Sequence, residues 1–157
     1  MRKKIIDSIS EGNLPSGQSW LDLEGLIQVE ITSENSAHPV ESALVPGGGP
    51  GWRAAQPGEQ TIRVVFDHPH SLRRIFLRFD EKEQARTQEF ALRWLPEGQK
   101  HSREIVRQQY TFSPPDTIEE VEDYRVELNG VTALEVKIVP DISRGAAYAS
   151  LTQMRLA

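Results

Sequence analysis

The sequence predicts an all-β protein, a sandwich or a barrel, built from about eight short strands. Three observations predict this class. Apolar and polar residues alternate in short blocks, turn signals separate these blocks at intervals of about 8–12 residues, and no long helical pattern occurs. A chain of 157 residues is the usual size of one domain. We therefore expect a single domain over residues 20–157, preceded by a flexible or weakly ordered leader over residues 1–19.

The first part of the chain is predicted to lead into a loop that carries a tryptophan beside an arginine. Leu26–Ile31 alternates as a half-buried strand does. Gly47–Gly58 contains successive glycines and two Pro-Gly pairs, which favour a loop, and Thr61–Phe66 then resumes the strand pattern. Between its turn signals this loop holds Trp52 and Arg53. A large aromatic residue in such a place either closes the end of a core or faces a ligand.

The rest of the chain continues the alternating pattern. Two short turns are expected between strands: Asp67-His68-Pro69-His70, and Asn129-Gly130 as a β-hairpin, because an Asn-Gly pair takes positive φ readily. The strands expected here are Leu72–Phe79, Gln88–Leu95, Glu104–Phe112, Val121–Leu128, Leu134–Ile138 and Ser150–Leu156. These strands complete the set of about eight.

Composition argues against several classes of protein. The net charge is -5, whereas proteins that bind nucleic acid normally carry the opposite balance to neutralise phosphates. The chain has no cysteine, so it offers no disulfide, thiolate nucleophile or thiolate metal site. No apolar run approaches the ~20 residues of a membrane helix, and no signal-peptide core follows the basic start. We expect a cytoplasmic protein with neither a nucleic-acid nor a membrane partner.

The sequence also lacks the usual patterns of catalysis and of cofactor binding. No Gly-x-Ser-x-Gly elbow is present, and no pair of carboxylates stands out among the 23 acidic residues. His68 and His70 flank Pro69 without the glutamate that would complete a cupin-type metal motif, and a catalytic metal needs three converging ligands. We therefore predict that the protein is not an enzyme and holds no metal or cofactor.

The order of these features resembles the galactose-binding-like domains, the discoidin or coagulation-factor type C group. The resemblance rests on the loop ending in Trp52 before Gln60–Phe66, on Leu72–Phe79, on Glu89–Trp94 before Glu97-Gly98, on Asp123–Leu128 and on Ala149–Leu156. It implies an eight-stranded antiparallel β-sandwich of the jelly-roll type from about Leu26 to Ala157. It also implies a binding module, often for carbohydrate, with the ligand loops gathered at one end. Secreted members commonly have a terminal disulfide, and many have an acidic calcium loop; Pro46–Gly51 contains no carboxylate for such a loop.

The resemblance places two loops at the ligand end. One carries Trp52 and Arg53, which would stack on a sugar ring and donate to its hydroxyls. The alternative is that Trp52 closes the core while Arg53 pairs with an acid such as Glu59. The other loop would bring Arg86, Gln88 and Glu89 together as a polar cluster. The alternative for this second loop is a solvated segment with one structural ion pair.

Two functions follow from these residues. The first is a non-catalytic module that binds a carbohydrate or glycoconjugate through Trp52, Arg53, Arg86, Gln88 and Glu89. The second is a protein-protein interaction module or accessory subunit without a small ligand. The absence of a signal peptide favours the second, because free glycans are scarce in the cytosol. Phe76 favours it too, since the alternation of Leu72–Phe79 places this residue on the outward face.

Overall fold

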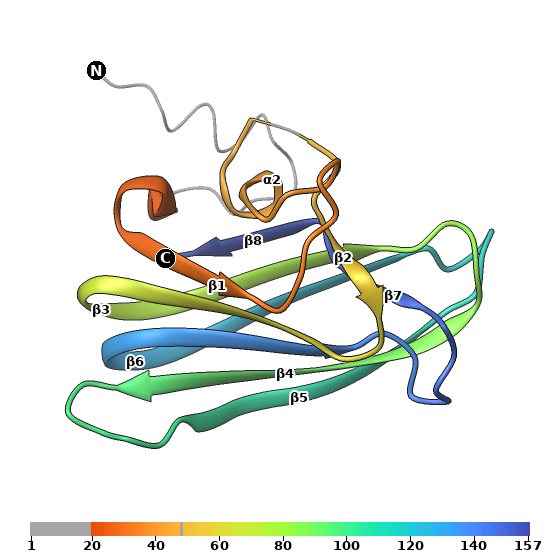
Figure 1. Cartoon of the computed structure of the whole chain (residues 1–157). Helices are drawn as coiled ribbons and strands as arrows, with labels where there is room; N and C mark the ends of the chain where they lie inside the picture. The colour runs from red at the N-terminus through yellow and green to blue at the C-terminus, as the bar shows by residue number, and fades with distance from the viewer. Residues whose placement is uncertain (1–19, 48) are drawn as a thin grey trace, which may run out of the picture.

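The computed structural model describes residues 20–47 and 49–157, and these residues form the eight-stranded antiparallel β-sandwich that was expected (Figure 1). The leader expected over residues 1–19 lies outside the described residues. The elements are η1 (Leu23–Gly25), β1 (Ile27–Ile31), α2 (Glu41–Leu44), β2 (Trp52–Pro57), β3 (Gln60–Asp80), β4 (Arg86–Pro96), β5 (Arg103–Phe112), β6 (Glu119–Val139), β7 (Tyr148–Leu151) and β8 (Gln153–Leu156). No helix in the described part of the chain is long and apolar enough to cross a membrane.

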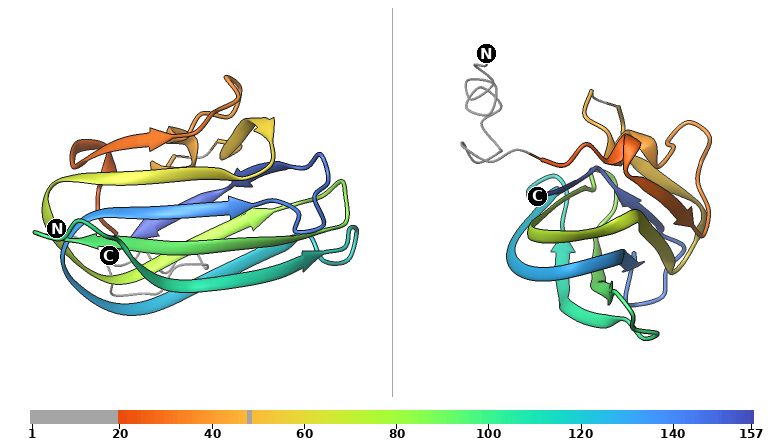
Figure 2. Two further views of the ribbon diagram at one scale, coloured as in Figure 1. Left: turned by 60° about the horizontal axis from the view of Figure 1, so that its bottom comes forward. Right: turned by 90° about the vertical axis from the view of Figure 1, so that its left-hand side faces the viewer.

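Two long strands belong to both layers of the sandwich. β3 and β6 have 21 residues each, pair with each other along their length, and curve between the layers (Figure 2). One layer has the order β1-β3-β6-β4-β5, in which β3 contributes its first half and β6 its second half. In the other layer, the second half of β3 lies between β8 and the first half of β6. Each long strand therefore ties the two layers together covalently.

The turns expected at residues 67–70 and 129–130 are wrong, because both places are bends inside a continuous strand. Residues 121–128 and 134–138 do not pair with each other; they pair with the second and first halves of β3. The register shifts between His70 and Leu72. These residues are two apart on β3, but their partners Val131 and Leu128 are three apart on β6. Gly130 has φ +67°, which accommodates the extra residue. The Asn-Gly pair thus directs a bulge rather than a hairpin.

Two other segments differ from the sequence-based assignment. Trp52–Pro57, expected as loop, is strand β2, and it pairs with β7. Ser150–Leu156, expected as one strand, is divided at Thr152 into β7 and β8, which pair with β2 and β3 respectively. Neither β2 nor β7 shows a clean alternation of apolar and polar residues, so periodicity alone does not identify them.

The core lies between the two layers and also reaches the second face of β3. Phe79 of β3 stacks on Phe90 of β4 across the layers, with 5.2 Å between ring centroids, and both are fully buried. Phe76, expected on the outward face, is only 2% exposed and lies 6.2 Å from the ring of Trp20. Residues that precede β1 therefore cover this face, and Phe76 does not form an exposed docking surface.

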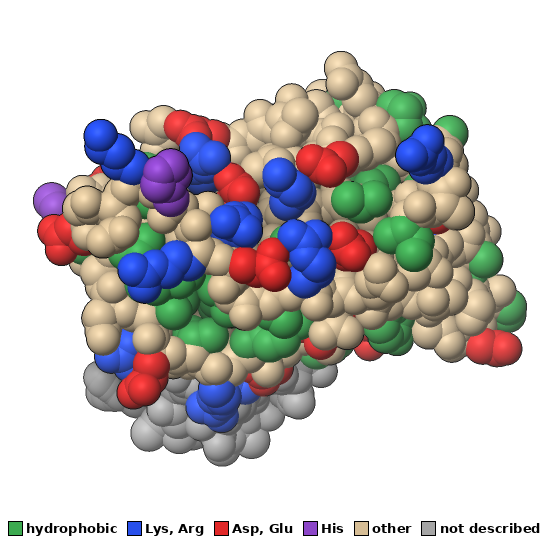
Figure 3. All heavy atoms as spheres, turned by 90° about the horizontal axis from the view of Figure 1, so that it is seen from below, with side chains coloured by type: hydrophobic (Ala, Val, Ile, Leu, Met, Phe, Trp, Pro, Cys, Tyr) green, Lys and Arg blue, Asp and Glu red, His purple; other side chains and the backbone are tan. Residues whose placement is uncertain are grey.

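The outer face of the five-stranded layer carries a row of alternating charges. Glu30, Arg63, Glu135, Arg93 and Glu104 occupy paired positions on five adjacent strands. Their ion pairs include Arg63–Glu135 at 2.7 Å and Arg93–Glu104 at 3.6 Å. Figure 3 shows basic and acidic side chains interspersed over the side of the molecule that it views. Such opposite-charge pairs across strands stabilise a sheet modestly and keep its outer face solvated.

Candidate functional site

A polar pocket lies at the end of the sandwich where β3 ends, opposite the bends of β3 and β6. Its volume is about 340 Å³, within the range of small-molecule sites. The loop before β2, the end of β3 with the loop that follows it, and the β7–β8 junction enclose it. The lining residues are His38, Gly49, Pro50, Trp52, Arg53, Arg78, Asp80, Glu81, Lys82, Glu83, Ser150 and Thr152. We call this the end pocket.

Trp52 forms part of the pocket wall but belongs to the core. Its side chain is 1% exposed, and its indole Nε1 donates to the main-chain oxygen of Ser33 at 3.0 Å. The ring therefore presents no open face on which a sugar could stack. This geometry fits the alternative in which Trp52 closes the end of the core.

A glycine brings the tryptophan loop against the β7–β8 junction. Gly51 has φ +84°, and a Cβ there would lie 2.7 Å from both the Leu151 oxygen and the Thr152 Cα. Only glycine fits this position without displacing the backbone. The Gly51 N–H donates to the Ser42 hydroxyl at 2.9 Å, which joins the loop to α2. The pocket wall is thereby fixed on two sides.

Arg53 lies at the mouth of the pocket and is exposed. Its guanidinium carbon lies 5.5 Å from the centre of the Tyr148 ring, a cation–π contact. The pairing suggested with Glu59 does not form, because Glu59 lies 3.8 Å from the Lys137 ammonium instead. Among the described residues Arg53 has no ion pair, so its donors remain available to a ligand.

The pocket also contains a fixed network of charges. The Nε of Arg78 lies 3.3 Å from Asp80 and 2.8 Å from Glu119, within ion-pair distance but without the geometry of a hydrogen bond. Asp80 Oδ2 also accepts a hydrogen bond of 2.8 Å from the Thr152 hydroxyl. In the same wall, His38 Nδ1 is buried and finds no hydrogen-bond partner among the described residues. The network supplies oriented donors and acceptors at an otherwise open cavity.

Arg86 is a buried structural residue that does not line the end pocket. Its Nε donates to Glu81 at 2.6 Å, its Nη1 donates to the Pro140 oxygen at 2.7 Å, and its guanidinium lies 4.9 Å from the Phe112 ring. Burial alone would raise the pKa of Glu81, but hydrogen bonds from Arg86 and from two main-chain N–H groups hold that pKa below its usual range. Arg86 therefore anchors the loop that contributes Glu81, Lys82 and Glu83 to the pocket.

The alternation of β4 keeps two of the three residues expected as one polar cluster, Arg86 and Gln88, together and places Glu89 on the other face. Gln88 is fully buried, accepts from Arg86 Nη1 at 3.3 Å, and donates to Glu120 Oε1 at 3.0 Å. Glu89 lies on the opposite face, where it accepts hydrogen bonds from Gln109 and Arg107. Those two bonds hold the pKa of Glu89 below its usual range. None of Arg86, Gln88 and Glu89 lines the end pocket.

The end pocket thus contains Trp52 and Arg53 of the first predicted loop. It also contains Glu81, Lys82 and Glu83, which precede Arg86 of the second. Sequence reasoning missed Arg78, Asp80 and Thr152. The alternation of Leu72–Phe79 places Arg78 on the same face as Phe76, but nothing signals that Thr152 lies against Asp80, 72 residues away. Among residues 20–47 and 49–157, no group of three His, Cys, Asp or Glu side chains is arranged to hold a metal ion.

The chain is similar in fold to known binding domains. A family 32 carbohydrate-binding module of Clostridium perfringens NanJ, in complex with galactose, superposes with a TM-score of 0.63 at 10% identity over 88% of this chain and 97% of that one. The family 32 module of AlyQ, in complex with 4,5-unsaturated mannuronic acid, gives 0.62 at 12% identity over 89% and 98%. An F5/8 type C domain from Bacteroides fragilis gives 0.59 at 13% identity over 90% and 97%.

These comparisons establish the galactose-binding-like β-sandwich fold. No family model matches the sequence. No curated protein matches it either.

Proposed function

We propose that this chain is a non-catalytic carbohydrate-binding module whose ligand site is the end pocket. The observation that carries the proposal is the network of Arg78, Asp80 and Thr152 beside the unpaired Arg53. A sugar presents many hydroxyl groups that both donate and accept, so its recognition requires donors and acceptors fixed at short range. Modules of the same fold bind galactose and an unsaturated mannuronic acid.

The available cations suggest a saccharide with a carboxylate or with several free hydroxyls. Arg53 and Lys82 line the pocket, and neither forms an ion pair with another described residue. A planar guanidinium can hold a carboxylate through two parallel hydrogen bonds. Because Trp52 is buried, ring stacking contributes little, and polar contacts dominate the affinity.

The test is titration calorimetry of the purified protein with galactose, N-acetylgalactosamine and an oligouronate. We expect saturable binding of at least one of these sugars, weakened about tenfold in Arg53→Ala, which corresponds to roughly 1.4 kcal/mol. Arg107→Ala is the matched control, since Arg107 is exposed on the outer sheet face, away from the pocket. Melting temperatures of both variants should stay near that of the wild type.

Two results would contradict the proposal. One is the absence of heat with every sugar in the panel at millimolar concentration. The other is binding that Arg53→Ala and Arg107→Ala weaken equally, because this would place the sugar elsewhere. One argument for the alternative of a protein partner, an outward-facing Phe76, no longer holds because Phe76 is buried.

A further inference from the structure

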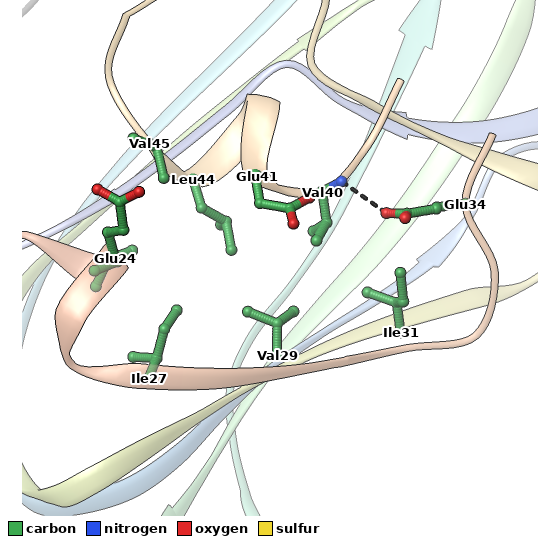
Figure 4. A pocket seen from close by; sticks show the side chains of 10 residues that line it. Glu24, Ile27, Val29, Ile31, Glu34, Val40, Glu41, Leu44 and Val45 are labelled. Atoms are coloured by element: carbon green, nitrogen blue, oxygen red, sulfur yellow. Dashed lines mark hydrogen bonds between the residues drawn. The ribbon is translucent and has the colours of Figure 1, made fainter. Parts of the chain in front are cut away.

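A second cavity lies away from the end pocket, between β1 and α2. Its volume is about 490 Å³. In Figure 4 the side chains of Ile27, Val29 and Ile31 point from β1 toward Val40 and Leu44. Among the described residues no aromatic side chain lines this groove, so it lacks the stacking platform of a typical sugar site. Of the residues that the structure describes, none lines both the end pocket and this groove.

Three carboxylates surround the apolar floor. Glu24 lies at one end of the groove, Glu34 at the other, and Glu41 on the α2 side (Figure 4). All three are exposed, and none forms an ion pair with another described residue. Glu34 also accepts a hydrogen bond of 2.9 Å from the Val40 N–H, which holds its carboxylate at the rim. The rim therefore favours a cationic ligand.

β1 leaves one side of its backbone open along the groove. In an antiparallel pair, alternate residues direct their N–H and C=O groups toward the partner strand. Leu26 accepts from Asp67 at 3.0 Å, and Thr32 donates to Thr61 at 3.1 Å, so the even-numbered residues face β3.

The main-chain groups of Ile27, Val29 and Ile31 consequently point away from β3. Within the described residues, β1 pairs with β3 alone. An open edge of this kind is a template for one more strand.

These features specify the chemistry of an occupant. An acyl chain would fill the apolar floor. It would form no hydrogen bonds with the main-chain groups of β1 and no ion pairs with the carboxylates. An extended peptide satisfies all three, since it pairs with the strand edge, inserts alternate side chains into the floor, and places charged residues at its two ends beside the rim carboxylates. We propose that the edge of β1 and the groove beside it bind an extended segment of a protein partner, with aliphatic residues at alternate positions and lysine or arginine at its two ends, beside Glu24 and Glu34.

The test uses fluorescence anisotropy of the full chain with a labelled peptide that alternates valine and threonine and carries two lysines at each end. A peptide with glutamate in place of lysine is the ligand control. We expect the lysine peptide to bind, more weakly as salt is added, and the glutamate peptide not to bind. Val29→Glu should weaken binding about tenfold or more by filling the groove with charge. Glu41→Gln should weaken it less.

The matched protein control is Val121→Glu, which makes the same change at a valine 49% exposed on the other layer. Binding should survive in this variant. The proposal fails if the lysine peptide does not bind, or if Val29→Glu and Val121→Glu affect binding alike.

Two further outcomes would assign the groove to another occupant and overturn the proposal. Concentration-dependent dimerisation that Val29→Glu abolishes, seen by sedimentation, would assign it to a second copy of this chain. A carbodiimide cross-link within one chain between Glu41 and Lys3 or Lys4 would assign it to the chain's own first residues. Mass spectrometry of the cross-linked full chain separates these outcomes from peptide binding.

Discussion

The indole Nε1 of Trp52 donates a 3.0 Å hydrogen bond to the main-chain oxygen of Ser33. This bond crosses from the start of β2 to the segment that follows β1, which is joined to β2 by further main-chain bonds such as Asn35 N–H to Arg53 oxygen at 2.8 Å. Trp52 is therefore a core residue that also satisfies a polar group of the loop. The wall of the end pocket depends on it.

Replacing Trp52 tests this structural role. Trp52→Ala should lower the free energy of unfolding by roughly 3–5 kcal/mol, because it empties a large core site. Trp52→Phe should cost less, since it keeps most of the ring but loses the bond to Ser33, a contribution of about 1 kcal/mol. Urea unfolding followed by circular dichroism measures both changes. Trp94→Phe, at a half-buried position, is the control, and equal losses at the two sites would contradict a special role for Trp52.

Replacing Gly51 and Gly58 by alanine distinguishes the stability cost of a steric clash from that of a left-handed backbone conformation. Both have positive φ, +84° and +91°, but only Gly51 has backbone atoms within 2.7 Å of where a Cβ would lie. Gly58→Ala should therefore cost about 1–2 kcal/mol, the strain of a left-handed residue. Gly51→Ala should cost clearly more and should loosen the pairing of β2 with β7. Thermal unfolding of the two variants measures this difference. A Gly51→Ala variant as stable as Gly58→Ala would mean that the backbone of the β7–β8 junction moves to make room for the Cβ.

The sequence predicted most strands because their apolar residues alternate and face a single core. Leu92 and Phe90, for example, are buried on the face that their period of two assigns. β2 was missed because it follows glycines and contains a proline, and because it pairs with β7, about 95 residues along the chain. Local propensity carries no information on such a partner. The bends of β3 and β6 were mistaken for turns for the same reason.

The candidate site was predicted only in part. Trp52 and Arg53 were identified from an aromatic and a cation between turn signals, and both line the end pocket. The direction of Trp52 depends on an acceptor at Ser33, and the burial of Arg86 depends on Pro140, 54 residues away. Long-range hydrogen bonds therefore decided which charged residues became structural, and the pattern of residue types does not encode them.

Glu120 makes the folding stability of the protein depend on pH. It is 1% exposed; Gln88 donates to its Oε1, while its Oε2 has no hydrogen-bond partner in the described structure. Burial, with the adjacent Glu122 carboxylate, raises the pKa of Glu120 to about 9. The nearby Arg86 charge lowers it only in part, since Glu81 already pairs with that guanidinium. The folded protein therefore holds the Glu120 proton at neutral pH.

The sign of the effect follows from proton binding in the two states. An unfolded glutamate has a pKa of about 4.3, so between that value and pH 9 the folded state binds the extra proton. The stabilisation is complete below the unfolded pKa and is lost as pH rises through the folded one. Urea unfolding at neutral pH and at about pH 9 should show the wild type losing stability. Glu120→Gln should lose less, because it keeps the acceptor for Gln88 without a proton to release. The control Glu127→Gln, at an exposed position of β6, should lose as much stability as the wild type. If Glu120→Gln also lost as much stability as the wild type, Glu120 would be ionised in the folded protein at neutral pH.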